Sequence, residues 1–133
     1  MVVDTSAIIA IARREPEALA FSTLLEQTPG KLMAVPTYLE CVFVLAGIAP
    51  NKGLSFLQGL VADTLIKLVP FGEQELEAAV DARIRYSRGS GHTAKLNFGD
   101  CFAYALAKTR NVPLLFKGED FIHTDIEPAL KPA

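Results

Sequence analysis

Four acidic side chains lie in apolar surroundings, where a carboxylate is costly unless it is paired or binds a cation. Asp4 ends the apolar start of the chain, Glu40 lies inside an apolar helical stretch, and Asp100 lies near the start of another. Asp120 follows the apolar run 114–116. Taken singly, each has an ordinary explanation, as a helix cap, a surface residue or a turn residue. Their shared placement is what suggests chemistry.

Carboxylates without His or Cys partners form a ligand set for Mg²⁺ or Mn²⁺ rather than for zinc. The reaction that suits such a site is cleavage of a phosphate ester, because the ion activates water and offsets charge on the leaving oxygen. We expect Thr5 or Ser6 to add a hydroxyl that positions a water or a phosphate oxygen. Asn97 either orients a ligand beside Asp100 or is an ordinary helix cap.

Other common active-site patterns are absent from the sequence. No Gly-x-Gly-x-x-Gly follows the first apolar run, and no Walker Gly-Lys-[Ser/Thr], Cys-x-x-Cys or His-Glu-x-x-His occurs. Ser6 stands where a haloacid-dehalogenase-type phosphatase would have its second Asp. With two histidines and no nucleophile elbow, a Ser–His or Cys–His mechanism is disfavoured.

Strand-like and helix-like segments alternate along the chain. The expected strands are 1–4, 32–35, 65–69 and 113–116, with a further one near Ile126. Helices are expected after residue 4, from Pro16 to Gln27, and over 38–46, 52–63, 73–88 and 97–110. Lys67 makes its strand an expected edge strand. This order predicts an α/β sandwich with a mostly parallel central sheet, whose carboxyl-terminal edge would gather the four acids.

Four segments resemble PIN-domain ribonucleases, specifically toxins of the VapC type. These segments are 2–7, 36–40, 96–107 and 114–121. The resemblance implies a PIN-like three-layer α/β/α sandwich spanning residues 1–133 as one domain. It also implies an endoribonuclease that uses Mg²⁺ or Mn²⁺ at Asp4, Glu40, Asp100 and Asp120. For the fourth acid, the neighbouring Glu119 and Asp125 stay open as alternatives.

The same resemblance implies partners. A VapC-type toxin belongs to a type II toxin–antitoxin pair, so we expect a cognate VapB-like antitoxin that blocks the site. We also expect a homodimer or a toxin–antitoxin hetero-oligomer. Two apolar stripes are candidates for the core, for a dimer face or for the antitoxin groove. They are Leu19, Phe21, Leu24 and Leu25, and Leu54, Phe56, Leu57 and Leu60.

A basic stretch between residues 82 and 99 contains no acid and is the predicted RNA-binding segment. Its candidate contacts are Arg83, Arg85, Arg88, His92 and Lys95. Tyr86 and His92 could stack on an unpaired base, but a role in the buried core or at an inactive surface is more common for such side chains. The alternative is a solvated helix end whose positive charge complements the helix dipole.

Composition limits the remaining classes. The chain has 133 residues, half of them hydrophobic, with 15 acids against 13 bases, which fits one compact domain and excludes disorder. The net charge of −2 argues against a generally basic nucleic-acid binder, but one divalent ion would bring it to zero. The sequence shows no membrane span and no signal peptide, so we expect a cytoplasmic protein, with Cys41 and Cys101 as buried thiols.

Two further functions stay open at this point. One is a catalytically silent PIN-fold binding module, whose acids hold a basic segment of a partner. The other is a Mg²⁺-dependent phosphatase acting on small phosphomonoesters. Metal-dependent degradation of RNA, abolished by a chelator, would separate the ribonuclease from both.

Overall fold

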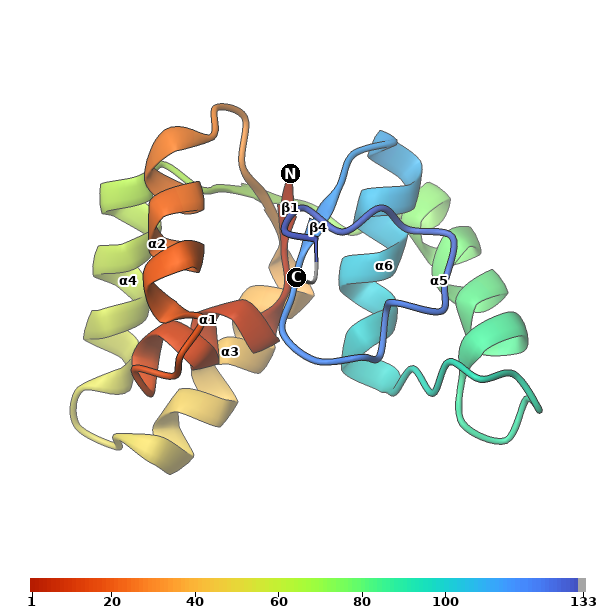
Figure 1. Cartoon of the computed structure of the whole chain (residues 1–133), viewed down its shortest axis with the longest axis horizontal. Helices are drawn as coiled ribbons and strands as arrows, with labels where there is room; N and C mark the ends of the chain where they lie inside the picture. The colour runs from red at the N-terminus through yellow and green to blue at the C-terminus, as the bar shows by residue number, and fades with distance from the viewer. Residues whose placement is uncertain (132–133) are drawn as a thin grey trace.

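The computed structural model describes residues 1–131 and shows a small parallel sheet between two groups of helices (Figure 1). The strands are β1 (Val2–Val3), β2 (Leu32–Ala34), β3 (Lys67–Val69) and β4 (Leu114–Leu115). They are ordered β3-β2-β1-β4, and every pairing is parallel. The predicted parallel sheet is therefore confirmed, with the Lys67 strand at an edge.

The strand predicted near Ile126 is wrong. Within the described residues, this segment contributes only an isolated bridge between Pro128 and Leu114. Leu114 accepts a backbone hydrogen bond from Ala129 and donates one to Glu127. The segment therefore pairs with β4 at Leu114 and does not continue as a strand. Pro128 cannot donate a hydrogen bond, which limits how far a ladder can extend there.

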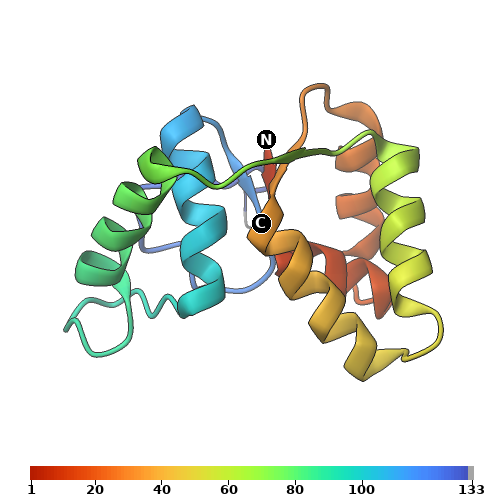
Figure 2. The same cartoon turned by 180° about the vertical axis from the view of Figure 1, so that it is seen from behind.

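Six helices are described. They are α1 (Thr5–Ala12), α2 (Ala18–Gln27), α3 (Val35–Ile48), α4 (Gly53–Thr64), α5 (Glu73–Tyr86) and α6 (Phe98–Arg110). Helices α1 to α4 lie on one side of the sheet, and α5 and α6 lie on the other (Figures 1 and 2). Helix α3 begins earlier than predicted because Pro36 is tolerated in a first helical turn, where its missing N–H has no partner to lose.

The strands explain why two helical layers form. Successive side chains of a strand point to opposite faces, so Val2 and Leu114 pack into the core beneath α5 and α6. Val3 and Leu115 pack into a separate core beneath α1 to α4. This arrangement is the expected three-layer α/β/α sandwich.

The two predicted apolar stripes contribute mainly to the second core. Phe21, Leu25 and Leu57 are buried there, whereas Leu19 and Leu54 are exposed. The two stripes therefore belong mainly to the hydrophobic core, and only the residues at their edges are exposed.

Two further expectations concern the cysteines and membranes. Cys41 and Cys101 are buried free thiols, as predicted, and neither is in a disulfide. Among residues 1–131, no helix has the length and apolar character needed to cross a bilayer.

Candidate active site

Asp4, Glu40, Asp100 and Asp120 line one cleft of about 460 Å³ at the carboxyl-terminal edge of the sheet. Asp4 follows β1, and Asp120 comes shortly after β4. Asp100 lies in the first turn of α6, and Glu40 lies within α3. Parallel strands place their carboxyl ends together, so four segments far apart in sequence meet there, at the lower edge of Figure 1.

Asp4 caps a helix with one carboxylate oxygen and leaves the other without a partner. Its Oδ2 accepts hydrogen bonds from the Ser6 backbone N–H at 3.0 Å and from Ser6 Oγ at 2.6 Å. Its Oδ1 is buried and makes no hydrogen bond within the described residues. Burial raises the pKa of Asp4 to about 6, although the bonds from Ser6 oppose the shift. The ordinary capping role and a ligand role therefore use different oxygens.

Asp100 has a similar divided role at the start of α6. Asn97 Oδ1 accepts a hydrogen bond from the Asp100 N–H, and Asp100 Oδ2 accepts one from the Asn97 N–H, both at 2.9 Å. Burial, together with the charges of Asp4, Asp120 and Glu40, raises the pKa of Asp100 to about 7. Asn97 is thus the ordinary cap, and through that cap it orients Asp100. The raised pKa reflects burial first and repulsion between the carboxylates second, and a bound cation would offset both by favouring the charged form.

Glu40 is held from two sides. Thr5 Oγ1 donates a hydrogen bond to Glu40 Oε1. On the other side the carboxylate lies against Gly99, where a Cβ atom would come within 2.6 Å of Glu40 Cδ. Gly99 therefore leaves the space that the carboxylate occupies.

The Thr5 and Ser6 hydroxyls both make hydrogen bonds within the cleft. That one of them also positions water or a phosphate oxygen stays a prediction. Thr5 donates to Glu40, while Ser6 Oγ donates to Asp4 and accepts a hydrogen bond from the Lys117 N–H at 2.9 Å. Both hydroxyls therefore orient carboxylates, and Ser6 also ties the end of β1 to the end of β4.

The donor set of the cleft fits Mg²⁺ or Mn²⁺. All four candidate ligands offer hard oxygens, and Asp4 has a buried oxygen without a partner. Within residues 1–131, no three His, Cys, Asp or Glu side chains are already closed around one point. Holding an ion would thus require the carboxylates to draw together from their positions around the cleft.

For the fourth acid, the structure separates the three candidates. Asp120 lines the cleft and its charge acts on Asp100. Asp125 accepts a hydrogen bond from Tyr104 Oη at 2.7 Å and pairs with Lys108 at 2.7 Å, outside the cleft. Glu119 is exposed and is not among the described lining residues.

Sequence reasoning missed two charged residues of the cleft, Lys117 and Glu15. Lys117 follows β4 just as Asp120 does, and that position was a usable signal. A base at the end of a parallel strand reaches the same edge of the sheet as an acid does.

Part of the predicted RNA-binding stretch serves the fold. Arg85 pairs with Asp81 at 3.0 Å and donates a hydrogen bond to Tyr86 Oη at 2.6 Å. Tyr86 is buried against Tyr104, which confirms the core role and leaves its ring unavailable to stack on a base. The His92 ring packs edge-on against Tyr86, and its Nδ1 accepts the Ala94 N–H.

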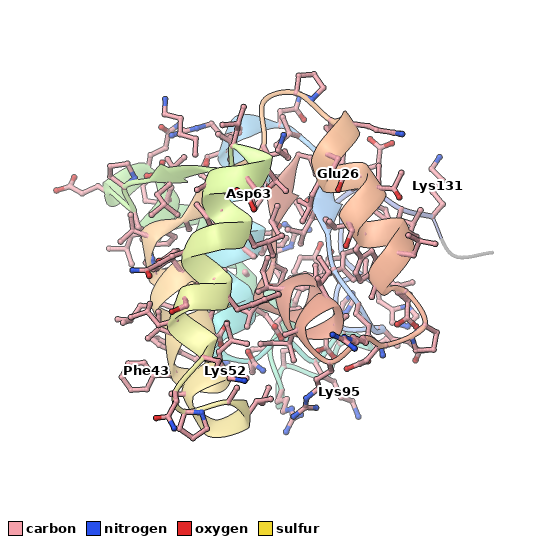
Figure 3. The ribbon with its side chains drawn as sticks, turned by 90° about the vertical axis from the view of Figure 1, so that its left-hand side faces the viewer. Glu26, Phe43, Lys52, Asp63, Lys95 and Lys131 are labelled. Atoms are coloured by element: carbon pink, nitrogen blue, oxygen red, sulfur yellow. The ribbon has the colours of Figure 1, made fainter. Side chains whose placement is uncertain are left out.

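The other basic residues face the surface. Arg83 and Arg88 line an apolar cavity of about 450 Å³ between α5 and α6. Asn97 lines both this cavity and the carboxylate cleft, so the two are adjacent. Lys95 is exposed and projects outward (Figure 3).

Comparison with known proteins identifies the family and agrees with this fold. The family model for the PIN domain matches residues 1–127, and the chain belongs to the PIN domain family. Within it, the chain belongs to the VapC ribonucleases. Ribonuclease VapC28 of Mycobacterium tuberculosis is 42% identical over 130 residues, covering 98% of each chain. Ribonuclease VapC30 of the same organism is 40% identical over 132 residues, covering 99% of this chain and all of that protein.

Solved structures share the fold at low sequence identity. The M. tuberculosis VapC20 structure, described as a Sarcin-Ricin loop cleaving toxin, superposes with a TM-score of 0.72 at 14% identity and covers 96% of this chain and 98% of that one. VapBC2 of Rickettsia felis, bound to a promoter DNA fragment, gives 0.73 at 12% identity and covers 96% and 95%. A toxin–antitoxin complex from Klebsiella pneumoniae gives 0.67 at 21% identity and covers 93% and 92%.

Proposed function

We propose that this protein is an endoribonuclease that hydrolyses RNA phosphodiester bonds with Mg²⁺ or Mn²⁺ held by Asp4, Glu40, Asp100 and Asp120. The observation that carries the proposal is the meeting of four carboxylates from four segments in one cleft. Membership of the VapC ribonucleases supports RNA as the substrate. A lone carboxylate cluster would be destabilising without a cation, so its presence favours a metal-dependent role.

When bound, the ion would activate water and offset the negative charge that develops on the phosphate and the leaving oxygen. The protein supplies the frame for this chemistry. Thr5 and Gly99 fix the Glu40 carboxylate, Ser6 fixes Asp4, and Asn97 fixes Asp100. Side chains oriented in this way lose little freedom when they bind a cation.

RNA would approach along the surface that carries Arg83, Arg88 and Lys95. Arg83 and Arg88 line the cavity next to the carboxylate cleft, and Asn97 lies between the two sites. Cations on this path would attract the phosphate backbone despite a net charge of −2. Arg85 and His92 are also exposed and stay candidate contacts, with Arg85 paired to Asp81 and the His92 ring packed against Tyr86.

We further propose that the protein is the toxin of a type II toxin–antitoxin pair and binds a VapB-like antitoxin. Helix α3 presents Leu39 and Phe43 at 56% and 73% exposure, and Phe43 projects from the surface in Figure 3. Val44, on the same helix, lines the carboxylate cleft. An antitoxin segment that covers α3 would therefore reach the cleft and block it. Two structural neighbours are described as toxin–antitoxin assemblies, which supports this partner.

A second association would involve two copies of this chain. Helix α5 exposes Leu76, Val80 and Ile84, and the neighbouring Phe98 is 81% exposed. This apolar face would be covered in a homodimer or in a toxin–antitoxin hetero-oligomer. Light scattering of the purified chain, alone and with its antitoxin, would distinguish these assemblies.

The central test is degradation of total RNA by the purified protein with Mn²⁺ or Mg²⁺, and its loss in EDTA. Asp100→Asn should fold and lose cleavage. Asp63→Asn is a matched control because Asp63 is an exposed residue of α4, outside the cleft (Figure 3). Cleavage by Asp100→Asn at the wild-type rate would contradict the assigned site. Absence of cleavage by wild type on several RNAs would favour a binding module instead.

A further inference from the structure

Lys117 is the single cation among the described residues that line the carboxylate cleft. The other charged residues of that lining are Asp4, Glu15, Glu40, Asp100 and Asp120. A phosphate group entering this cleft therefore meets strong negative potential everywhere except at this ammonium.

The main chain of Lys117 is fixed to the site. Its N–H donates a hydrogen bond to Ser6 Oγ at 2.9 Å, and the same hydroxyl donates to Asp4 Oδ2 at 2.6 Å. A chain of two hydrogen bonds thus links the candidate ligand Asp4 to the backbone from which the lysine side chain extends. Gly118 follows with φ +95°, a conformation that favours glycine, so the chain can turn sharply after Lys117.

The side chain of Lys117 forms ion pairs with two carboxylates. Its Nζ pairs with Glu15 and lies 3.1 Å from Glu17 Oε2. Both acids lie in the short connection between α1 and α2. The Lys117, Glu15 and Glu17 side chains are 34%, 25% and 38% exposed, although Glu17 Oε2 itself is buried. Because the ammonium is itself partly exposed to water, it can exchange these carboxylates for another anion.

We infer that Lys117 is a phosphate-binding residue of the RNA site, and that Glu15 and Glu17 hold its ammonium when no RNA is bound. RNA would then be held on two sides of the cleft. Arg83 and Arg88 lie beyond Asn97 on one side, and Lys117 extends from the end of β4 on the other. This inference rests on the proposed RNA substrate and adds a contact that none of the acidic residues can provide.

The test measures RNA binding in EDTA, where cleavage cannot occur. The probe is a short fluorescein-labelled single-stranded oligouridylate, followed by anisotropy over a range of salt concentrations. Lys117→Gln should weaken binding by about three- to tenfold and lower the salt slope by about 0.7, the value for one lost phosphate contact on a single strand. Lys117→Arg should retain binding because it keeps the charge. Lys131→Gln, at an exposed lysine that lines neither the cleft nor the neighbouring cavity, should bind like wild type.

A second variant tests the same inference from the opposite direction. Glu15→Gln combined with Glu17→Gln removes the competing anions, so RNA binding should tighten by a similar factor. This readout does not depend on whether Lys117→Gln folds, and melting curves of each variant report its folding directly.

The outcomes separate this inference from the proposed function. If wild type cleaves RNA but Lys117→Gln matches it in affinity and salt slope, the Lys117 contact is wrong and the ribonuclease stands. A lower melting temperature with unchanged RNA affinity would assign Lys117 to the structure of the α1–α2 connection, and would also overturn the contact. If wild type neither binds nor cleaves RNA, both the proposed function and this inference fail.

Discussion

Gly99 and Glu40 occupy adjoining space so closely that a single methyl group on residue 99 would overlap the Glu40 carboxylate. The two residues belong to α6 and α3, which pack against each other at the edge of the sheet. Gly99 is itself next to Asp100. Because residue 99 has no side chain, the Glu40 carboxylate can lie against the first turn of α6, which carries Asp100.

Gly99→Ala should therefore lower RNA cleavage by at least about tenfold, because displacement of a positioned group by even a small distance is costly to catalysis. The methyl group would force the Glu40 carboxylate away from Thr5, or would separate α3 from α6. We expect the variant to remain folded with a loss of about 1–3 kcal/mol in the free energy of unfolding. Cleavage rates with Mn²⁺ and urea denaturation provide the two measurements.

Gly59→Ala is the matched control for this substitution. Gly59 lies within α4, and a Cβ there meets no atom within 4 Å. Alanine has the higher helix propensity, so the control should gain about 0.5–1 kcal/mol and keep full activity. Equal activity of the Gly99→Ala variant would show that Glu40 does not need its observed position.

Thr5→Val removes the hydroxyl that donates to Glu40 and preserves the branched shape of the side chain. Loss of a group that orients a metal ligand typically reduces metal affinity by about 10- to 100-fold. We expect Mn²⁺ to bind more weakly by such a factor, as measured by calorimetry, with little change in the unfolding midpoint. Thr5→Ser should restore binding, and Thr23→Val, at an exposed helical threonine, should have no effect on it.

The local parts of this site could be predicted from sequence. Asp4 and Asp100 each lie within three residues of their hydrogen-bond partners, so capping patterns at strand ends and helix starts reveal them. The alternation of strands and helices then predicts a parallel sheet and the edge at which Asp120 joins them.

The parts that sequence reasoning missed depend on distant contacts. Ser6 bonds to Lys117 across 111 residues, and no local pattern specifies that pairing. Tyr86 belongs to a segment that reads as an exposed basic helix end, yet tertiary packing against Tyr104 buries it. Charge and periodicity define which residues are available, whereas the packing of helices on the sheet decides which of them reach the cleft.

The metal-free protein should lose stability as the pH rises from about 4 to 7. Asp4 and Asp100 have folded-state pKa values of about 6 and about 7, against 3.8 for the free side chain. The folded state therefore keeps protons that the unfolded chain has released, and its advantage disappears as the pH rises through the folded pKa values. Asp100→Asn should accordingly be more stable than wild type at neutral pH in EDTA, by roughly 1–3 kcal/mol.

Divalent ions should reverse this dependence. An ion at the carboxylates stabilises their charged forms and binds only the folded state, so Mn²⁺ should raise the melting temperature more at pH 7 than at about pH 5. Calorimetry in buffers of different ionisation enthalpy should also detect protons released on binding. If Mn²⁺ left the melting temperature unchanged at every pH, the result would contradict a metal site in this cleft.

A pair of matched substitutions decides which acid after β4 serves the site. Asp120 lines the cleft, so Asp120→Asn should lower Mn²⁺-dependent cleavage by at least about tenfold and should leave stability nearly unchanged. Asp125 is bonded to Tyr104 and Lys108, and these partners lower its pKa. Asp125→Asn should therefore keep activity and lose about 1–2 kcal/mol of stability.

The pH dependence of the two variants provides an independent check. Because the folded-state pKa of Asp125 is lowered, its stabilising contribution is present above the unfolded pKa and is lost as the pH falls through the folded value. The difference in stability between wild type and Asp125→Asn should thus be greatest near neutral pH and should shrink in acid. If instead Asp125→Asn abolished cleavage while Asp120→Asn did not, the fourth carboxylate of the site would be Asp125, and the segment after β4 would have to bring Asp125 into the cleft.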